Sequence, residues 1–131
     1  MGKWKWVSEK LEELGFEDLS KEARKIHEHL VEIYGTEETE DWIYDESYIN
    51  GIYEEDKKRN GIFGALCRIK DVVSTGKYCI ACVSTPLNCM GYSDCLQCEY
   101  GKKYGRCTDV QDSEYKRFLK RLEKAIWGYR A

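Results

Sequence analysis

Apolar side chains recur in the first segment of the chain with the spacing of an amphipathic helix. The repeating positions are Trp4, Val7, Leu11 and Leu14. The repeat stops at Gly15, which predicts a helix that ends there. Phe16 follows the glycine and is expected to fold back on Leu11, a contact that often accompanies a glycine at a helix end.

A second helix is predicted to run up to Gly35. Its apolar stripe consists of Ala23, Ile26, Leu30 and Ile33. Ser20 has a side chain suited to capping a helix start, and Glu22 would then lie in the first turn, where a negative charge is favoured. We therefore expect the second helix to begin at Ser20.

Residues 36–60 are acidic and interleaved with aromatic and aliphatic side chains. Their spacing predicts a third helix, capped by Thr36 or Thr39 and interrupted at Gly51 and again at residues 59–61. Residues 62–73 form a further helical stripe that ends before Gly76.

The last segment has one apolar and one basic face. The apolar face comprises Tyr115, Phe118, Leu119, Leu122, Ala125, Ile126 and Tyr129, and the basic face comprises Lys116, Arg117, Lys120, Arg121 and Lys124. Asp112 or Ser113 can cap the start, and Glu114 suits the first turn. This pattern predicts an amphipathic C-terminal helix whose basic face is either only solvated or in contact with nucleic acid.

These patterns predict a mostly α fold in one domain. The chain has 131 residues, enough for a buried core. We divide it into an acidic helical part (1–75), a cysteine-rich insert (76–110) and the C-terminal amphipathic helix (111–131). No signal peptide or membrane span is recognisable, which predicts a cytoplasmic protein without a membrane partner. Few Gln and Asn beside many Glu and Lys are typical of heat-adapted proteins.

Charge is distributed unevenly along the chain. Residues 1–56 contain 6 Lys and Arg against 17 Asp and Glu, whereas residues 57–131 contain 15 against 7. The two halves are expected either to neutralise each other within the fold or to bind partners of opposite charge. Such partners would be a nucleic acid for the basic half and a basic protein for the acidic half.

Six of the seven cysteines lie between Tyr78 and Cys107. Their spacing is Cys79-x2-Cys82-x6-Cys89-x5-Cys95-x2-Cys98-x8-Cys107. Two Cys-x2-Cys pairs suit tetrahedral zinc, because two thiolates three residues apart can turn inward on one tight loop. An iron–sulfur cluster or disulfide bonds remain alternatives. The sequence predicts a cysteine-rich metal-binding or disulfide-stapled knob before the last helix.

The six-cysteine spacing resembles the binuclear zinc cluster domain of fungal transcription factors. In that family six cysteines hold two zinc ions, and two thiolates bridge both metals. The resemblance implies that Cys79, Cys82, Cys89, Cys95, Cys98 and Cys107 are zinc ligands. The family carries basic residues between its second and third cysteines, where a short helix meets DNA, whereas this chain has VSTPLN at residues 83–88. The resemblance therefore supports the ligand arrangement more than DNA binding.

Three further residues could bind metal but have simpler interpretations. Cys67 lies beside the apolar stripe of residues 62–73 and is expected to be a small buried side chain, or to pair with another cysteine. His27 and His29 are two positions apart, so on a helix they point to opposite sides and cannot chelate one ion together. We expect two histidines at the boundary of the core.

Basic and aromatic residues near the cysteines could hold nucleic acid. The candidate residues are Lys77, Lys102, Lys103, Tyr104, Arg106, Lys116, Arg117, Lys120 and Lys124. Lysine and arginine on phosphates with tyrosine stacked on bases is a common arrangement in modules that bind single strands. No catalytic motif is present, so the sequence favours a small zinc-binding protein that contacts nucleic acid. A redox or electron-transfer protein and a non-enzymatic protein-interaction module are the alternatives.

Overall fold

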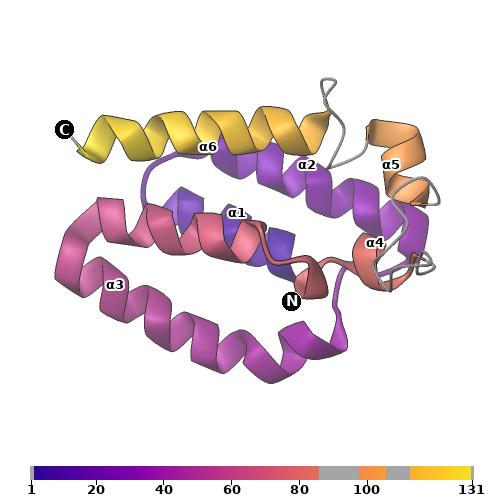
Figure 1. The fold of residues 1–131 in the computed structure, drawn as a ribbon, viewed down its shortest axis with the longest axis horizontal. Coiled ribbons are helices and arrows are strands. Elements are labelled where there is room, and N and C mark those ends of the chain that lie inside the picture. Colours follow the sequence, from indigo (N-terminus) through magenta and orange to yellow (C-terminus); the bar gives the residue numbers. More distant parts are fainter. Residues whose placement is uncertain (1, 86–97, 106–112, 131) are drawn as a thin grey trace, which may run out of the picture.

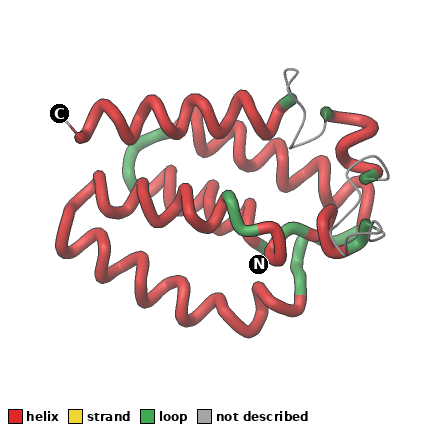
Figure 2. The backbone as a smooth tube through the Cα atoms, viewed as in Figure 1, coloured by secondary structure: helices red, strands yellow, loops and turns green. Residues whose placement is uncertain are grey.

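The protein is described here by a computed structural model that places residues 2–85, 98–105 and 113–130. All regular structure in these ranges is helical, which confirms the mostly α prediction (Figure 2). The elements are α1 (Lys3–Glu13), α2 (Glu17–Tyr34), α3 (Glu40–Val73), the 3₁₀ turn η1 (Gly76–Tyr78), α4 (Ile80–Val83), α5 (Glu99–Tyr104) and α6 (Glu114–Arg130). None of the described helices has the length and hydrophobicity needed to cross a bilayer.

The turn between α1 and α2 forms as predicted, but α2 begins earlier. Gly15 has φ of 90°, and the Phe16 N–H donates to the Leu11 carbonyl at 2.9 Å, closing the end of α1. The predicted start of α2 at Ser20 is wrong, because the helix begins at Glu17. Ser20 is instead buried against α1, where its hydroxyl donates to the Ser8 carbonyl at 2.8 Å.

Helix α3 is a helical hairpin with its bend at Gly61. Thr39 caps the helix, as predicted, and accepts a hydrogen bond from the Trp42 N–H at 3.1 Å. The predicted interruption at Gly51 is wrong, since the helix runs through it. Gly61 has φ 64° and ψ −142°, outside the helical region, and the chain reverses there (Figure 1). The two arms approach closely at Gly64, where a Cβ atom would lie 2.3 Å from the Asp56 carbonyl oxygen.

The core lies among α1, α2, the two arms of α3 and α6 (Figure 1). Its largest buried side chains are aromatic: Trp4, Trp6, Trp42, Tyr53 and Phe118. Edge-to-face contacts join Trp6 to Trp42 and Tyr53, and Trp4 to Phe118 of α6. Such pairs add to the stabilisation from burial alone. The core therefore connects the first helix directly to the last.

Helix α6 has the predicted amphipathic character. Ser113 accepts a hydrogen bond from the Lys116 N–H at 3.2 Å and caps the start. Phe118 and Leu122 are buried, whereas the basic residues Arg117, Lys120, Arg121 and Lys124 are exposed.

The start of α1 is held by a buried carboxylate from the loop between α2 and α3. Glu37 is 2% exposed and accepts hydrogen bonds from the backbone N–H groups of Trp4 and Lys5. His27 of α2 contacts the same carboxylate at 2.8 Å. Gly2 has no capping side chain, so Glu37 supplies the acceptor that the first N–H groups need. Gly2 also leaves room for it, because a Cβ there would clash with the Glu37 carboxylate.

We expect Gly64→Ala to destabilise the fold by about 1–3 kcal/mol, because the new methyl group would overlap the backbone of the opposite arm. Gly51→Ala is the matched control on the same helix, since a Cβ there meets nothing within 4 Å. The control should stabilise the protein by ~0.5–1 kcal/mol through helix propensity. Urea unfolding of both variants measures the difference, and equal effects would contradict the close approach at Gly64.

Burial raises the pKa of Glu37 above its ordinary value of 4.5, although hydrogen bonds from Trp4 and His27 oppose the shift. The folded state therefore favours the protonated carboxyl, and this contribution to stability is complete below the unfolded pKa. It should be lost as the pH rises through the raised pKa. In Glu37→Gln this position does not titrate. The difference in free energy of unfolding, wild type minus variant, should therefore decrease as the pH increases above ~4.5. A difference that grew with pH would contradict this assignment.

Candidate metal centre

Cys79 lies at the start of a short helix at one end of the bundle. It follows η1 and occupies the N-cap position of α4. Its side chain makes no capping hydrogen bond to the helix, although the Cys82 side chain and the nearby backbone N–H groups of Ala81 and Cys82 lower the pKa of its thiol. The Cys79 residue is 8% exposed, and Cys82 is half-buried. The first Cys-x2-Cys pair thus forms a tight turn in which both sulfur atoms lie together.

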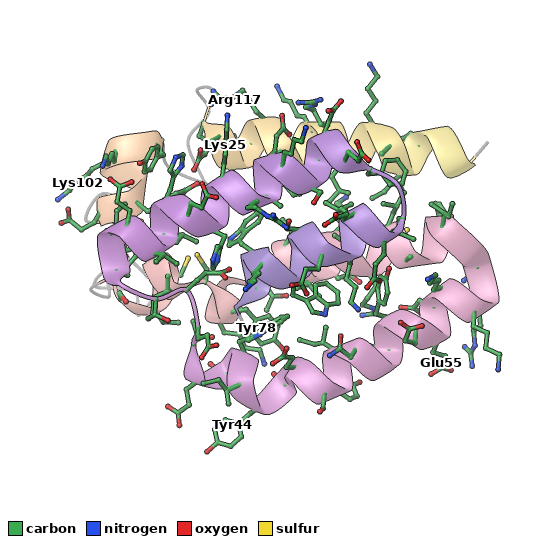
Figure 3. All side chains as sticks on the ribbon, turned by 180° about the vertical axis from the view of Figure 1, so that it is seen from behind. Lys25, Tyr44, Glu55, Tyr78, Lys102 and Arg117 are labelled. Carbon is green, nitrogen blue, oxygen red and sulfur yellow. The ribbon has the colours of Figure 1, made fainter. Side chains whose placement is uncertain are left out.

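The turn is anchored to α3 by Tyr78. This side chain, labelled in Figure 3, donates a hydrogen bond from its hydroxyl to Asp45 at 2.6 Å, and its ring packs edge-on against Trp42 with 5.4 Å between ring centroids. Lys77 also pairs with Asp45, at 3.3 Å. These contacts fix η1, and therefore Cys79, relative to the core.

Cys98 occupies the same position at a helix start as Cys79. It is the N-cap residue of α5, and its sulfur accepts a hydrogen bond from the Gly101 N–H at 3.3 Å. Two short helices therefore each begin at a cysteine, and at α5 the cysteine sulfur also caps the helix.

Both cysteines lie near Tyr34 at the end of α2. The Tyr34 hydroxyl accepts a hydrogen bond from the Tyr100 N–H at 3.3 Å. Burial raises the pKa of Tyr34 to about 12, and the charges of Cys98 and Cys79 add to this shift. Tyr34 thus lies within electrostatic reach of two cysteines that are distant in sequence.

A buried lysine contributes positive charge beside Cys79. Lys3 is 2% exposed, and its ammonium group donates to the Val73 carbonyl at 2.9 Å and the Thr75 carbonyl at 3.4 Å. The pKa of Cys79 falls to about 5, chiefly through the hydrogen bond from Cys82, and the Lys3 charge assists against the opposing effect of burial. The geometry therefore favours a thiolate at Cys79.

A small cavity adjoins these groups. It has a volume of about 200 Å³ and is lined mainly by apolar side chains, among them Trp4, Ile26, Leu30, Val73, Tyr100 and Tyr115, together with Lys3, Cys79 and Cys82. A small apolar pocket with a few polar groups is the usual form of a ligand site.

The described residues contain only part of the predicted ligand set. Cys79, Cys82 and Cys98 are described, whereas Cys89, Cys95 and Cys107 lie outside the described residues. Within residues 2–85, 98–105 and 113–130, no group of three or more Cys, His, Asp or Glu side chains is placed to hold a metal ion. No disulfide joins two of the described cysteines. Cys67 is half-buried on α3 rather than fully buried.

The two histidines bind different carboxylates, in agreement with their predicted opposite orientation. His27 contacts Glu37 at 2.8 Å, and His29 contacts Glu114 of α6 at 2.9 Å. Neither histidine therefore belongs to the cysteine site.

Several of the predicted nucleic-acid residues pair with acidic groups. Lys77 pairs with Asp45 and Lys103 with Glu32, both in the acidic half, and Lys102 pairs with Glu99 of its own helix. Tyr104 stacks on His29 with 3.8 Å between ring centroids. Among the described residues, Lys116, Lys120 and Lys124 are not paired with a carboxylate. Arg117 lies on the exposed face of α6, and Arg106 is outside the described residues. The two halves thus neutralise each other in part.

No motif in the sequence predicts that Lys3 and Tyr34 lie beside the cysteines. Both are separated from Cys79 by more than forty residues, and neither lies in a motif. The only signal for Lys3 was its place on the apolar side of α1, next to Trp4, where a lysine is unusual.

We expect the thiolate absorbance of Cys79 in the reduced, metal-free protein to titrate near pH 5, well below the ordinary cysteine value of ~8.5. Lys3→Met should move this titration upward because it removes the neighbouring cation. Lys5→Met is the matched control, since Lys5 is exposed on the same helix. Cys79→Ser identifies the signal, and a wild-type titration at the ordinary value would contradict the assignment.

No family model matches the chain, and no curated protein and no solved structure matches it. The resemblance to the fungal binuclear zinc cluster therefore remains a prediction from cysteine spacing. The described part of the candidate centre consists of Cys79 and Cys98 at the starts of α4 and α5, with Tyr34 and Lys3 beside them.

Proposed function

We propose that this chain is a small zinc-binding protein whose metal is held by its Cys-x2-Cys pairs. The observation that carries the proposal is that Cys79 and Cys98 each occupy the N-cap position of a short helix and both lie near Tyr34, with the Cys98 sulfur accepting the Gly101 N–H. Zinc binds cysteine as the thiolate, and N–H groups aimed at sulfur support that form. Cys82 supplies a further sulfur next to Cys79, and the remaining ligands would come from Cys89, Cys95 and Cys107.

The lengths of the two helices support a metal in this region. Helix α4 has 4 residues and α5 has 6, and helices this short are unstable unless other contacts hold them. Thiolate–metal bonds would supply such contacts where the sequence offers few large aliphatic side chains.

The charge around the sulfurs also suits a metal–thiolate centre. Four thiolates on one zinc ion carry a net negative charge, which is costly to bury unless a cation lies nearby. Lys3 provides that cation, and it has no carboxylate partner among the described residues. Its ammonium group is held by two backbone carbonyls.

We expect anaerobically purified protein to contain zinc, measured by elemental analysis. Cys79→Ser and Cys98→Ser should each lose most of the bound metal, because each removes a thiolate ligand. Cys67→Ser is the matched control and should retain it, since Cys67 lies on α3 away from the predicted cluster. If the protein were brown and contained iron and sulfide, the bound group would be an iron–sulfur cluster and not zinc. Protein free of metal with all thiols intact would overturn the proposal.

A second candidate, a dithiol redox function, is supported by the Cys79–Cys82 pair. The pair combines a stabilised thiolate, a neighbouring thiol and an adjoining cavity, which is the arrangement that oxidoreductases use. Mass spectrometry decides between the two candidates, because disulfide formation by an oxidant removes two hydrogen atoms (two protons and two electrons) per bond and leaves no metal.

Contact with nucleic acid through the basic half remains a prediction from the sequence. The residues available for it on α6 are Lys116, Lys120 and Lys124, which have no carboxylate partner among the described residues. Affinity based on phosphate contacts would fall steeply with salt.

A further inference from the structure

A second cavity lies between α2 and α6, apart from the cysteines. It has a volume of about 300 Å³ and is lined by Glu22, Lys25, Ile26, His29, Glu114 and Arg117. This volume is at the lower end of the ~300–1,000 Å³ typical of small-molecule sites. Five of its six lining residues are titratable, in contrast to the apolar lining beside Cys79.

The imidazole of His29 is held in one orientation at this cavity. Its Nδ1 lies 2.9 and 3.0 Å from the two carboxylate oxygens of Glu114. Its ring stacks on Tyr104, with 3.8 Å between centroids and 6° between planes. Because the carboxylate accepts a hydrogen bond from Nδ1–H, Nε2 is the nitrogen left to meet a ligand.

The Glu114 carboxylate is itself fully engaged. Besides His29, it accepts a hydrogen bond from the hydroxyl of Tyr100, a residue that is 2% exposed. The other acid of the cavity, Glu22, pairs with Arg121 of α6 through Oε1, whereas its Oε2 is buried without a hydrogen-bond partner among the described residues. The donors on Glu114 and the Arg121 charge beside Glu22 reduce the repulsion that these two acids exert on an anion.

Two cations lie at the rim, one from each helix. Lys25 of α2 and Arg117 of α6 project from the same edge of the bundle (Figure 3), and both line the cavity. Lys25 has no carboxylate partner among the described residues. A lysine, an arginine and an oriented histidine are the groups that proteins use to bind phosphate oxygens.

We propose that the α2–α6 cavity binds a phosphoryl group through Lys25, Arg117 and Nε2 of His29. The group could come from a small phosphate ester or from the backbone of a nucleic acid, since both offer the same oxygens. Only Arg117 of these three belongs to the basic residues that sequence analysis singled out; Lys25 comes from the acidic half. The site does not depend on the metal proposal.

The test uses the full-length protein as purified, with isothermal titration calorimetry against three probes. The probes are inorganic phosphate, adenosine 5′-monophosphate and a short single-stranded RNA. Lys25→Ala should weaken binding about tenfold, as expected for loss of one charge-assisted hydrogen bond, and Arg117→Ala should do at least as much. Both side chains are exposed, so the variants should fold.

Lys21→Ala is the matched control. Lys21 is an exposed lysine on the same helix, one turn before Lys25, and lines a different depression. The Lys21→Ala variant should bind inorganic phosphate and adenosine 5′-monophosphate as tightly as the wild type. An equal loss in Lys21→Ala and Lys25→Ala would show diffuse attraction and overturn the proposal.

The probes also distinguish the source of the phosphoryl group. Binding of phosphate and the mononucleotide, sensitive to Lys25, supports a small phosphate ester. Binding of RNA alone, with the same sensitivity, supports a nucleic-acid backbone. Absence of binding to all three probes overturns the proposal. ¹⁵N spectra of the His29 imidazole provide a second measurement, because a bound phosphoryl group should shift the Nε2 signal while the Nδ1 contact with Glu114 persists.

Discussion

The carboxylate of Glu37 at the start of α1 is the contact on which the arrangement of the molecule depends. It satisfies N–H groups that Gly2 cannot cap, and it links the α2–α3 loop to the first helix. The same contact positions the next side chains along, Lys3 and Trp4. Lys3 reaches the carbonyls that follow α3 and lies beside Cys79, and Trp4 packs against α6. A buried acid thus sets the position of groups at both ends of the chain.

Helix α2 has a comparable role for the two candidate sites. Its end carries Tyr34, next to Cys79 and Cys98, and its middle carries Lys25 and His29 at the cavity shared with α6. Tyr100 belongs to both surroundings, because its N–H donates to Tyr34 and its hydroxyl to Glu114. The cysteine region and the α2–α6 cavity are therefore separate candidate sites on one scaffold, connected by Tyr100 and by Ile26, which lines both cavities.

Periodicity and capping residues predicted most of the fold, because both are local properties of the sequence. The turn at Gly15, the Thr39 cap and the amphipathic α6 follow directly from them. The start of α2 did not follow from Ser20, because a serine that can cap a helix can equally hydrogen-bond to a neighbouring helix. The roles of Glu37 and Lys3 could not be predicted, since each is one of many charged residues. Each gains its role only from contacts with residues that are distant in sequence. For the cysteine site, spacing predicted Cys79 and Cys98 as neighbours of one centre, but not Tyr34.

The long connection between α3 and α6 has a consequence for folding. The hairpins formed by α1 with α2 and by the two arms of α3 close over short distances in sequence, whereas α6 must dock after the chain has passed from Val73 to Glu114. Loop-closure entropy opposes that step. A covalent or metal link from Cys82 to Cys98 would bypass the intervening segment and shorten the effective loop. Formation of the link at the cysteines and packing of α6 would then be thermodynamically coupled, although the cysteines and α6 lie in different parts of the molecule.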